Sequence, residues 1–573
     1  MTKIKNNYIL GISCGFHDSG AALINNGKVI GATLEESFTG IKHDESFPFK
    51  SIEWLLASNN LTASDIDVVS FYENPTLKIN RIQKSVKKGG FFNLLNSSSI
   101  ISRNKKAYDE IENTIKLIFG NEIEISYVEH HLSHLAYSYY TSPYERTAIV
   151  SVDGVGEWET AVIAYGDKNT ITKLQTIEYP HSLGMLYSAF TAFLGFKPNE
   201  GEYKVMGLAP YGNPKAYLDK FESIISPTED GGFELNMDFF DYEWSTDMMF
   251  NEKLGELFGF TNRLPDEELE NHHMDLAATL QQVYENYFFK FLNRAFELKS
   301  VPFLCLSGGC AYNGTANGKI TELSKFQTLW IPPAPSDGGS AIGCALYHYY
   351  TNNPNVVRVD NSVPYLGPSY TNNEIKEILD ACEEDVWYEY KEYSDLIPYV
   401  SKQIVDGNVI GWFEGKMEFG ARALGNRSIL ANPRDPQMKS RVNRVIKKRE
   451  GFRPFAPMVK EEDRTKYFDY KLLVPFMNQV VRVKAEHRKN LPAITHIDGS
   501  ARIQTVSNRQ HGNMYKLLCQ LQKDNEYPMV LNTSFNLKDQ TMVLDPKTAI
   551  ETFLNCEMDI LILQNYIVKK KIK

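Results

Sequence analysis

Cysteine is scarce in this 573-residue sequence, and no two cysteines have the spacing of a metal-binding pair. The seven cysteines are odd in number and scattered, and none forms a CxxC pair. Disulfide-stabilised proteins carry dense, even sets of cysteines, and zinc ribbons carry CxxC pairs. The composition therefore excludes a disulfide scaffold and a zinc ribbon, and it predicts reduced thiols and a cytoplasmic protein.

Long apolar runs and an excess of positive charge are also missing. No segment approaches the roughly 20 apolar residues that cross a bilayer, and the start, MTKIKNNYILGIS, lacks a signal-peptide core. The formal net charge is -10, whereas a protein that coats nucleic acid needs a basic surface to neutralise phosphates. We therefore expect no membrane and no nucleic-acid partner.

The remaining composition is that of an ordinary globular protein, with 43% hydrophobic and 23% charged residues. A chain of this length exceeds the size of a single core, so we expect two or three domains. The segment from Asn352 to Ser362 is polar and rich in asparagine. It is the best candidate for a linker between domains.

Two histidines stand four residues apart in the segment EHHLSHLAYS. His130 and His134 at this spacing project from one face of a helix. The apolar run 147–152 predicts a buried strand that ends at Asp153. Two imidazoles and a carboxylate suit iron, zinc or manganese, although such a histidine pair also occurs as an ordinary surface or core pair. His131 faces another way and is not expected to be a ligand.

An internal repeat links two distant parts of the chain. Residues 8–36 and 147–179 both read as a strand, a turn with glycine and aspartate, a second strand, a tight turn and a third strand. Such turns can present backbone N–H groups to phosphate oxygens. Two of them in tandem predict the duplicated, two-lobed fold shared by actin, Hsp70 and sugar kinases, in which ATP lies between the lobes.

A third glycine-rich segment, FLCLSGGCAYNGTANGKI, predicts a nucleotide loop. A strand runs into Gly308 and Gly309, and the helix that follows carries Asn313 and Asn317 on one face. Glycines permit close approach to a phosphate or ribose, and amides can bond the nucleotide, although the glycines would also serve merely to turn the chain. Farther along, Asp337 lies at another strand-turn-helix junction and would complete a His, His, Asp, Asp metal set.

The densest polar signature lies in the C-terminal part of the chain. Its basic side chains are interleaved with glycines and apolar residues, and they are Arg422, Arg427, Lys447, Lys448, Arg449 and Arg453. Arginine gives planar, bidentate recognition of phosphate or carboxylate, so we expect an anion pocket for a small phosphorylated substrate. Two alternatives are a solvated charged helix over 442–450 and an RNA-binding face.

Ten motifs occur along the chain in a fixed order. They are FHDSGAALI, EHHLSHLAYS, VSVDGVGE, GEYKVMGLAPYG, LSGGCAYN, PSDGGSAIG, MEFGARALGNRSILANPR, REGFRPFAP, DGSARIQTV and LNTSFN. Together they resemble the NodU/CmcH family of O-carbamoyltransferases over nearly the whole chain. The resemblance implies an α/β protein with an actin/Hsp70-like domain over 1–356, similar to the metal-dependent tRNA threonylcarbamoyl transferases. It further implies a YrdC-like domain over 357–543, similar to the threonylcarbamoyl-AMP synthases, and a segment 544–573 that returns to the first domain.

The chemistry that this resemblance implies has two steps. Carbamoyl phosphate would be converted to carbamate, which attacks the α-phosphate of ATP to give carbamoyl adenylate and pyrophosphate. The carbamoyl group would then pass to a hydroxyl of a small-molecule acceptor, a sugar or another natural product, and AMP would leave. ATP with Mg²⁺ is the implied co-substrate, and Fe²⁺ is the implied divalent cofactor. The sequence does not identify the acceptor.

The resemblance also assigns roles to single residues. The anion-binding set of the second domain would be Arg422, Lys447, Arg453, Arg502 and Ser534. In the first domain the metal ligands would be His130, His134, Asp153 and Asp337, and the residues that face the nucleotide would be Asp153, Gly308, Gly309, Asn313 and Asn317. His17 would be the general base for the acceptor hydroxyl, unless it only satisfies its turn. Lys42 would lie near the nucleotide or the acceptor.

Three positions depart from the family pattern. Ser37 stands where an arginine is expected, Ala421 stands where proline is usual, and the segment NTSFNLKDQTMV lacks the usual Gly-Glu-Pro. Two other functions remain open on the sequence alone. A tRNA threonylcarbamoyl transferase would use the same metal site on RNA, and an actin-like or Hsp70-like switch would bind a nucleotide and a partner without carbamoyl transfer.

Overall fold

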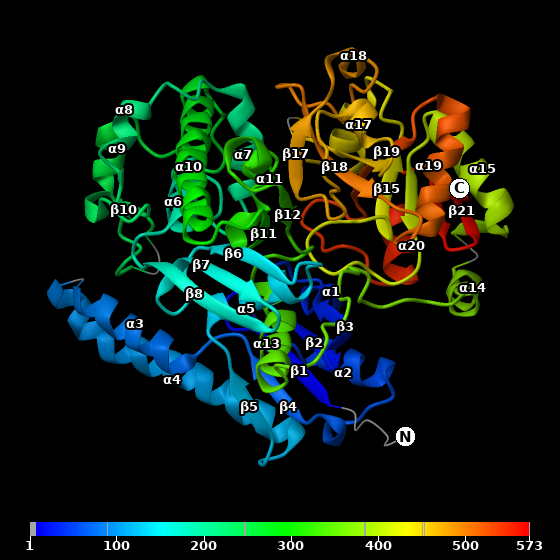
Figure 1. Ribbon diagram of the computed structural model, residues 1–573. Coiled ribbons are helices and arrows are strands. Elements are labelled where there is room, and N and C mark those ends of the chain that lie inside the picture. The colour runs from blue at the N-terminus through cyan, green and yellow to red at the C-terminus, as the bar shows by residue number, and fades with distance from the viewer. Residues whose placement is uncertain are drawn as a thin grey trace. The chain divides into compact units, whose positions relative to one another are not determined.

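The computed structural model describes residues 7–88, 90–245, 248–382, 385–449, 451 and 453–571 (Figure 1). The chain divides into two compact units. The first unit comprises Met1–Ala32 and Glu45–Ser362, and the second comprises Thr33–Asp44 and Val363–Lys573. We predicted a boundary after residue 356, and the structure divides the chain after Ser362. The inclusion of Thr33–Asp44 in the second unit was not predicted.

The first unit begins with a five-stranded sheet of order β3-β2-β1-β4-β5. Its strands are β1 (Tyr8–Ser13), β2 (Gly20–Asn25), β3 (Lys28–Leu34), β4 (Val68–Phe71) and β5 (Glu124–Tyr127). β1 pairs antiparallel with β2 and parallel with β4, and β4 pairs parallel with β5. The turn between β2 and β3 has positive φ at Asn26 (49°) and Gly27 (79°), the conformation that an Asn-Gly hairpin turn favours.

A second five-stranded sheet repeats the first one in the order β12-β11-β6-β7-β8. Its strands are β6 (Arg146–Val152), β7 (Glu159–Asp167), β8 (Thr170–Glu178), β11 (Phe303–Ser307) and β12 (Thr328–Trp330). β6 pairs antiparallel with β7 and parallel with β11, and β11 pairs parallel with β12. The two sheets share one topology, which confirms the α/β duplication that the repeated strand-turn-strand pattern predicted.

Two helices connect the sheets within the first unit. α5 (His130–Tyr140) and α13 (Asp337–Asn352) are almost entirely buried and pack closely on each other. A Cβ added at Gly343 would lie only 1.9 Å from the carbonyl oxygen of Ser133 on α5. Only glycine fits this contact, which lets α13 pack closely against α5.

Other helices surround the two sheets. They include α2 (Phe49–Ser58), α3 (Pro75–Lys88), α4 (Gly90–Phe119), α6 (Leu183–Phe193), α7 (Glu202–Leu208), α9 (Glu252–Phe258), α10 (Asn271–Leu298) and α11 (Gly314–Asn317). In Figure 1, α3 and α4 lie on one side of β6, β7 and β8, and α10 lies on the other. Among the described residues, no helix has both the length and the apolar character needed to cross a bilayer.

The second unit is built on a nine-stranded mixed sheet of order β13-β21-β20-β14-β15-β19-β16-β18-β17. Its strands are β13 (Val386–Tyr390), β14 (Ile410–Phe413), β15 (Arg427–Ala431), β16 (Ala456–Lys460), β17 (Gln479–Arg482), β18 (Ser500–Val506), β19 (Met529–Ser534), β20 (Ile560–Leu563) and β21 (Tyr566–Lys570). Helices α14 (Asn372–Ala381), α15 (Tyr393–Val405), α19 (Gly512–Asn525) and α20 (Pro546–Leu554) accompany the sheet.

The C-terminal segment lies in this second unit, which corrects the expectation that residues 544–573 return to the first domain. β20 pairs in parallel with β14, and β21 pairs antiparallel with β13 and β20. All four residues of β20, Ile-Leu-Ile-Leu, are buried. An apolar strand that is covered on both faces is stable inside a sheet, so the segment completes the core of the second unit.

Candidate metal centre and anion site

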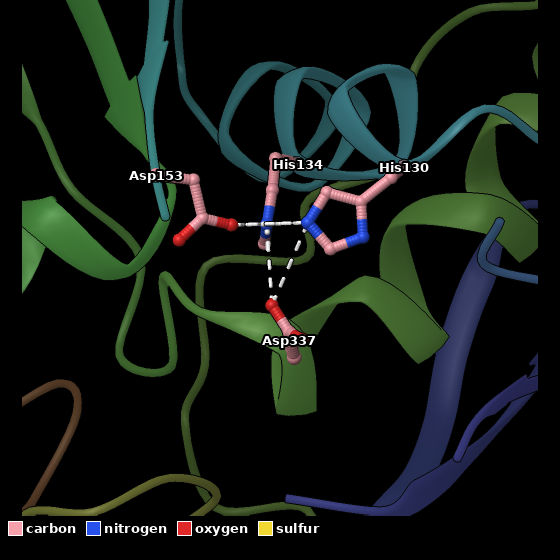
Figure 2. Close-up of side chains that lie close together, drawn as sticks. All are labelled: His130, His134, Asp153 and Asp337. Carbon is pink, nitrogen blue, oxygen red and sulfur yellow. Dashed lines mark hydrogen bonds and ion pairs between the residues drawn. The ribbon is translucent and has the colours of Figure 1, made fainter. Parts of the chain in front are cut away.

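Four side chains from three elements converge in the first unit. His130 and His134 lie one turn apart on α5, Asp153 directly follows the buried strand β6, and Asp337 opens α13 (Figure 2). A carboxylate in the first turn of a helix is favoured by the helix dipole, which suits Asp337 to its position. All four residues are at most 9% exposed. The structure thus brings together the four predicted metal ligands.

Their donor atoms point at one another. The Nε2 atoms of His130 and His134 are 3.0 Å apart, and they lie 3.0 and 2.9 Å from Oδ2 of Asp153. Oδ1 of Asp337 lies 3.7 Å from Nε2 of His130 and 3.5 Å from Nε2 of His134. A metal about 2.1 Å from each of four ligands spaces tetrahedral donor atoms about 3.4 Å apart. The set therefore fits a divalent ion without rearrangement of the backbone.

Neighbouring groups hold the ligands in place. Nδ1 of His134 lies 3.1 Å from the Ser340 hydroxyl, which fixes the imidazole plane. Oδ1 of Asp153 accepts hydrogen bonds from the backbone N–H groups of Gly154 (2.8 Å) and Gly309 (3.0 Å), and this leaves Oδ2 for the centre. Sequence reasoning did not assign Ser340, although it lies in the PSDGGSAIG motif.

The charges of the centre are strongly coupled. Burial lowers the pKa of His134, but hydrogen bonds and attraction from Asp153 and Asp337 outweigh it and raise the pKa to about 9. Burial raises the pKa of Asp153, but the two histidines hold it well below its usual value. The two carboxylates therefore stay ionised, and they favour positive charge at this point, whether a proton or a metal ion supplies it.

The third histidine of the motif lies outside this set, as predicted. Nδ1 of His131 lies 2.9 Å from the Ser151 hydroxyl, and the ring is fully buried. Burial, with His130 and His134 nearby, lowers the pKa of His131 well below its usual value. His131 is therefore a neutral residue of the core beside the centre.

The predicted nucleotide loop supports the carboxylate of Asp153. Gly308 has φ 85°, and a Cβ there would lie 2.2 Å from the carbonyl oxygen of Val152. A Cβ at Gly309 would lie 2.8 Å from Oδ1 of Asp153. Both glycines are thus required for the loop to approach the end of β6 and to donate the Gly309 N–H to Asp153.

The two asparagines of this segment bond within the protein. Oδ1 of Asn313 caps α11 at the N–H of Ala316 (3.1 Å), and its amide pairs with the amide of Gln281 (3.1 Å). Asn317 is 0% exposed and donates to the carbonyl oxygen of Ala311 (2.7 Å). The side chain of Asn317 thus belongs to the buried support of the loop, and its contact with the adenosine stays a prediction.

His17 lies at the edge of the metal centre. Its Nδ1 is 3.0 Å from Oδ2 of Asp18, and its Nε2 is 3.8 Å from Oδ2 of Asp337, with 21% of the side chain exposed. Burial lowers the pKa of His17, but Asp337 and Asp18 outweigh it and raise the pKa to about 9. The imidazole therefore carries a proton at neutral pH unless additional positive charge, such as a metal ion beside Asp337, offsets the carboxylates.

A second cluster, in the second unit, is made of cations. Burial, together with Arg422, Arg449 and Arg453, lowers the pKa of Arg502 far below its usual value. The charged groups that act on Arg502 are all positive. Arginine remains charged in proteins, so the guanidinium groups of these three arginines repel that of Arg502. We name Arg422, Lys447, Arg449, Arg453 and Arg502 the cation cluster.

Lys447 is the buried amine of the cation cluster, at 2% exposure. Its Nζ donates to the carbonyl oxygen (2.9 Å) and hydroxyl (3.1 Å) of Ser534 and to Oδ1 of Asn536 (2.8 Å), all of which are uncharged. Burial lowers its pKa well below the usual value, and Arg449, Arg453 and Lys42 lower it further. Buried cations without carboxylates to offset them are typical of an anion site.

The five residues predicted to bind anions therefore lie together in one unit, and the structure adds Arg449, Lys42 and Asn536. Arg449, which sequence reasoning left open as part of a solvated helix, belongs to the cation cluster. Lys42 is exposed and acts on Lys447 in the second unit, although it precedes most of the first unit in the sequence. Asn536, in the LNTSFN motif, orients Lys447.

Arg427 has a different role from the other arginines of its motif. Its side chain is 0% exposed, and its guanidinium donates to the carbonyl oxygens of Glu414 (2.8 Å) and Pro368 (3.0 Å). It also lies 3.6 Å from the centre of the Phe413 ring. Arg427 therefore joins loops of the second unit and is not available to an anion. Lys448, which follows Lys447 in the sequence, is exposed and is not part of the cation cluster.

Comparisons with known proteins agree with these motifs. Residues 8–346 match the family model of the carbamoyltransferase N-terminus, and residues 401–570 match that of the carbamoyltransferase C-terminus. The chain is 39% identical to an uncharacterized protein of Synechocystis sp., over 98% of this chain and 97% of the relative. It is 34% identical to the nodulation protein NolNO of Sinorhizobium fredii, over 97% of this chain and 79% of the relative.

Solved structures give a weaker likeness. Component A of (R)-2-hydroxyglutaryl-CoA dehydratase from Acidaminococcus fermentans matches 61% of this chain and 99% of its own with a TM-score of 0.31 and 13% identity. A score this low supports no inference about ligands or mechanism.

Proposed function

The chain belongs to the carbamoyltransferase family, and from that premise we propose that it is an ATP-dependent O-carbamoyltransferase that uses carbamoyl phosphate as donor. The observation that carries the proposal is the cation cluster. The cluster consists of four guanidinium groups and the buried amine of Lys447, and the hydrogen-bond acceptors of that amine are neutral, so the cluster suits an anion. A small phosphorylated donor supplies the missing negative charge.

The cation cluster suits the first step that we propose. Water cleaves carbamoyl phosphate to carbamate and phosphate, and the carbamate oxygen then attacks the α-phosphorus of ATP. The bond from that phosphorus to the bridging oxygen breaks, and the products are carbamoyl adenylate and pyrophosphate. Arg422, Arg453 and Arg502 hold the anionic groups and offset the charge that develops on the phosphoryl oxygens. Lys447, which Ser534 and Asn536 orient, acts as a further positive group.

The second step takes place at the metal centre of the first unit. His130, His134, Asp153 and Asp337 would hold a divalent ion, and such an ion supplies Lewis acidity and a charge that orients a phosphate. His17 takes the proton of the acceptor hydroxyl, whose oxygen attacks the carbamoyl carbon while AMP leaves. This role requires a neutral imidazole, and the positive charge of a bound ion favours that form because it offsets Asp337.

Pyrophosphate release tests the proposed function directly. Purified protein is given ATP with and without carbamoyl phosphate, as wild type, Arg422→Ala and Arg502→Ala. We expect release to require carbamoyl phosphate and to fall at least a hundredfold in both variants, because removal of one charge-stabilising donor typically costs about 10²–10³ in rate. Lys448→Asn is the matched control, since it removes a neighbouring exposed charge at a residue with φ 51°, which asparagine tolerates.

The outcomes separate the competing functions. ATP turnover that is equal without carbamoyl phosphate would refute carbamoyl transfer and leave a nucleotide-dependent switch. Release of AMP in the presence of tRNA, and not of small hydroxylated acceptors, would favour a tRNA-modifying enzyme. Loss of activity in Lys448→Asn to the same degree would show that the assay reports overall charge and not the cation cluster.

A further inference from the structure

Helix α3 carries a row of three basic residues on one face. Lys78, Arg81 and Lys84 are spaced three apart, so their side chains follow one another along the helix. Each cation lies over an aromatic ring of another segment. Lys78 Nζ is 5.7 Å from the Phe16 ring centre, Arg81 Cζ is 4.8 Å from that of Tyr179, and Lys84 Nζ is 4.7 Å from that of Trp158. We name Lys78, Arg81 and Lys84 the α3 row.

The near end of the α3 row is connected to the metal centre through short contacts. The ring of Phe16 lies 4.6 Å from that of His17, whose Nε2 is 3.8 Å from Asp337. The residue before Trp158 is Glu157, and its carboxylate accepts the backbone N–H of His130 at 3.0 Å. The row thus borders the region where the acceptor hydroxyl must be placed.

The carboxylates near the α3 row already have partners. Glu73 is 2% exposed, and it binds Lys78 Nζ at 2.7 Å and the Tyr108 hydroxyl at 2.5 Å. Glu157 accepts the backbone N–H groups of Asn74 (2.6 Å) and His130. Lys78 is therefore neutralised by Glu73, whereas no such ion pair joins Arg81 or Lys84 to a carboxylate of the described residues.

Arg81 is the central residue of the row. Its Nε is buried and has no hydrogen-bond partner among the described residues. Burial lowers its pKa, and the Tyr179 hydroxyl and the carboxylates Glu73 and Glu157 only partly offset this effect. A guanidinium that is stacked on one face and unpaired at its edge is arranged for a planar anion. Lys84, which is exposed, adds a second charge one turn along the helix.

The glycine-rich loop forms another side of the metal centre. There Gly309 donates its N–H to Asp153, and the segment around Asn313 is held by Gln281 of α10. In Figure 1, α3 and α10 lie on opposite sides of β6, β7 and β8. Under the proposed function, the glycine loop serves the adenylate, which leaves the side of α3 for the acceptor.

We propose that the acceptor is an anionic hydroxyl compound, a sugar acid or a sugar ester of sulfate or phosphate, whose negative group binds Arg81 and Lys84. This inference rests on the proposed function and adds the substrate class. The rise of an α-helix places Lys84 about 9 Å farther along the axis than Lys78. An acceptor with its hydroxyl at the metal centre would extend its negative group along the α3 row toward Arg81 and Lys84.

Matched sugars test the proposal. Carbamoylation of glucose, glucuronate and glucose 6-sulfate is measured with labelled carbamoyl phosphate, and binding of the same three sugars is measured by calorimetry. The wild type should favour the anionic sugars at least tenfold, because a charge-assisted hydrogen bond contributes the free energy of about one order of magnitude in affinity. In Arg81→Gln and in Lys84→Gln this preference should fall toward unity, and Lys106→Gln, an exposed residue of α4 paired with Glu110, should retain it.

The measurements distinguish this proposal from the proposed function. Carbamoyl-phosphate-dependent pyrophosphate release, measured on the same preparations, reports whether the donor chemistry holds, while calorimetry reports anion binding even if transfer fails. A wild type that binds glucose and its two anionic relatives equally, or binds none of them, would overturn the α3 assignment. If Arg81→Gln weakens binding of AMP as much as that of glucose 6-sulfate, the row holds a nucleotide phosphate and the proposal is wrong.

Discussion

Replacement of Arg502 by methionine tests whether the cation cluster is strained in the absence of an anion. Methionine keeps much of the alkyl stem of arginine and removes the charge. Arg502 is half-buried, its buried Nε has no hydrogen-bond partner among the described residues, and the charges that act on it are those of Arg422, Arg449 and Arg453. We therefore expect Arg502→Met to stabilise the protein when no anion is present, although substitution of an arginine in most folded proteins is neutral or destabilising.

The size of the effect follows from Coulomb repulsion. Two unit charges about 8 Å apart repel by roughly 2 kcal/mol at an effective dielectric constant of about 20. The guanidinium groups are partly exposed, so solvent screening reduces this to about 1 kcal/mol or less for each neighbour. With three neighbours, and a loss of some packing, the net gain should be about 1–2 kcal/mol. In a unit of this size that raises the transition temperature by about 2–8 °C.

Scanning calorimetry in phosphate-free buffer of low ionic strength gives the measurement, and a second scan with inorganic phosphate gives the comparison. Phosphate should raise the transition temperature of the wild type, since a ligand that binds only the folded state stabilises it, and it should raise that of Arg502→Met much less. Added sodium chloride should narrow the difference between the two proteins, because it screens the repulsion. A variant that unfolds at a clearly lower temperature than the wild type without phosphate would refute the reasoning, because Arg502 would then have a stabilising counter-charge.

Three further predictions concern other residues of the two units. Gly309→Ala should weaken binding of a divalent ion about 10–100-fold in a metal titration, because the Cβ of the alanine would lie 2.8 Å from Oδ1 of Asp153. An unchanged affinity would contradict the supporting role of the loop. Phosphate binding should be accompanied by proton uptake at pH values between the depressed pKa of Lys447 and its usual 10.5, because the bound anion raises that pKa. Calorimetry in buffers of different ionisation enthalpy measures this uptake, and Lys447→Met should abolish it. In that same pH range the ligand-free wild type should become more stable as pH rises, since its unfolded state binds more protons than its folded state. Arg427→Met should lower the free energy of unfolding by about 3–5 kcal/mol in urea titrations, because it leaves buried carbonyl oxygens unpaired and removes a cation from the Phe413 ring. A loss of phosphate binding without loss of stability would contradict this structural role.

The duplicated fold of the first unit could be predicted from the sequence because its signals are local. A hairpin turn such as Asn26–Gly27 and a glycine-rich turn between two short apolar strands each specify their own geometry. Their recurrence at residues 147–179 then predicts a second copy of the same sheet, and the order of the strands confirms it. His130, Asp153 and Asp337 of the metal centre lie at element ends that similar local patterns mark, and His134 follows one helical turn after His130.

Long-range pairing could not be predicted in the same way. The apolar segment Ile560–Leu563 reads as a buried strand from its composition, but the sheet that it joins depends on an open edge of β14, about 150 residues earlier in the chain. The assignment of Thr33–Asp44 to the second unit has the same cause, because no local pattern records which core a short connecting segment contacts.

The arginines of the C-terminal motif show why residue type alone does not assign a role. Arg422 and Arg427 stand five residues apart in one motif, and both offer five N–H donors. Arg427 opens β15, where carbonyl oxygens of adjacent loops accept hydrogen bonds from both terminal nitrogens of its guanidinium. Arg422 lies before the strand, among other cations. What distinguishes an anion-binding arginine from a structural one is therefore the kind of groups that the fold places around it, and those groups are fixed only when distant loops have come together.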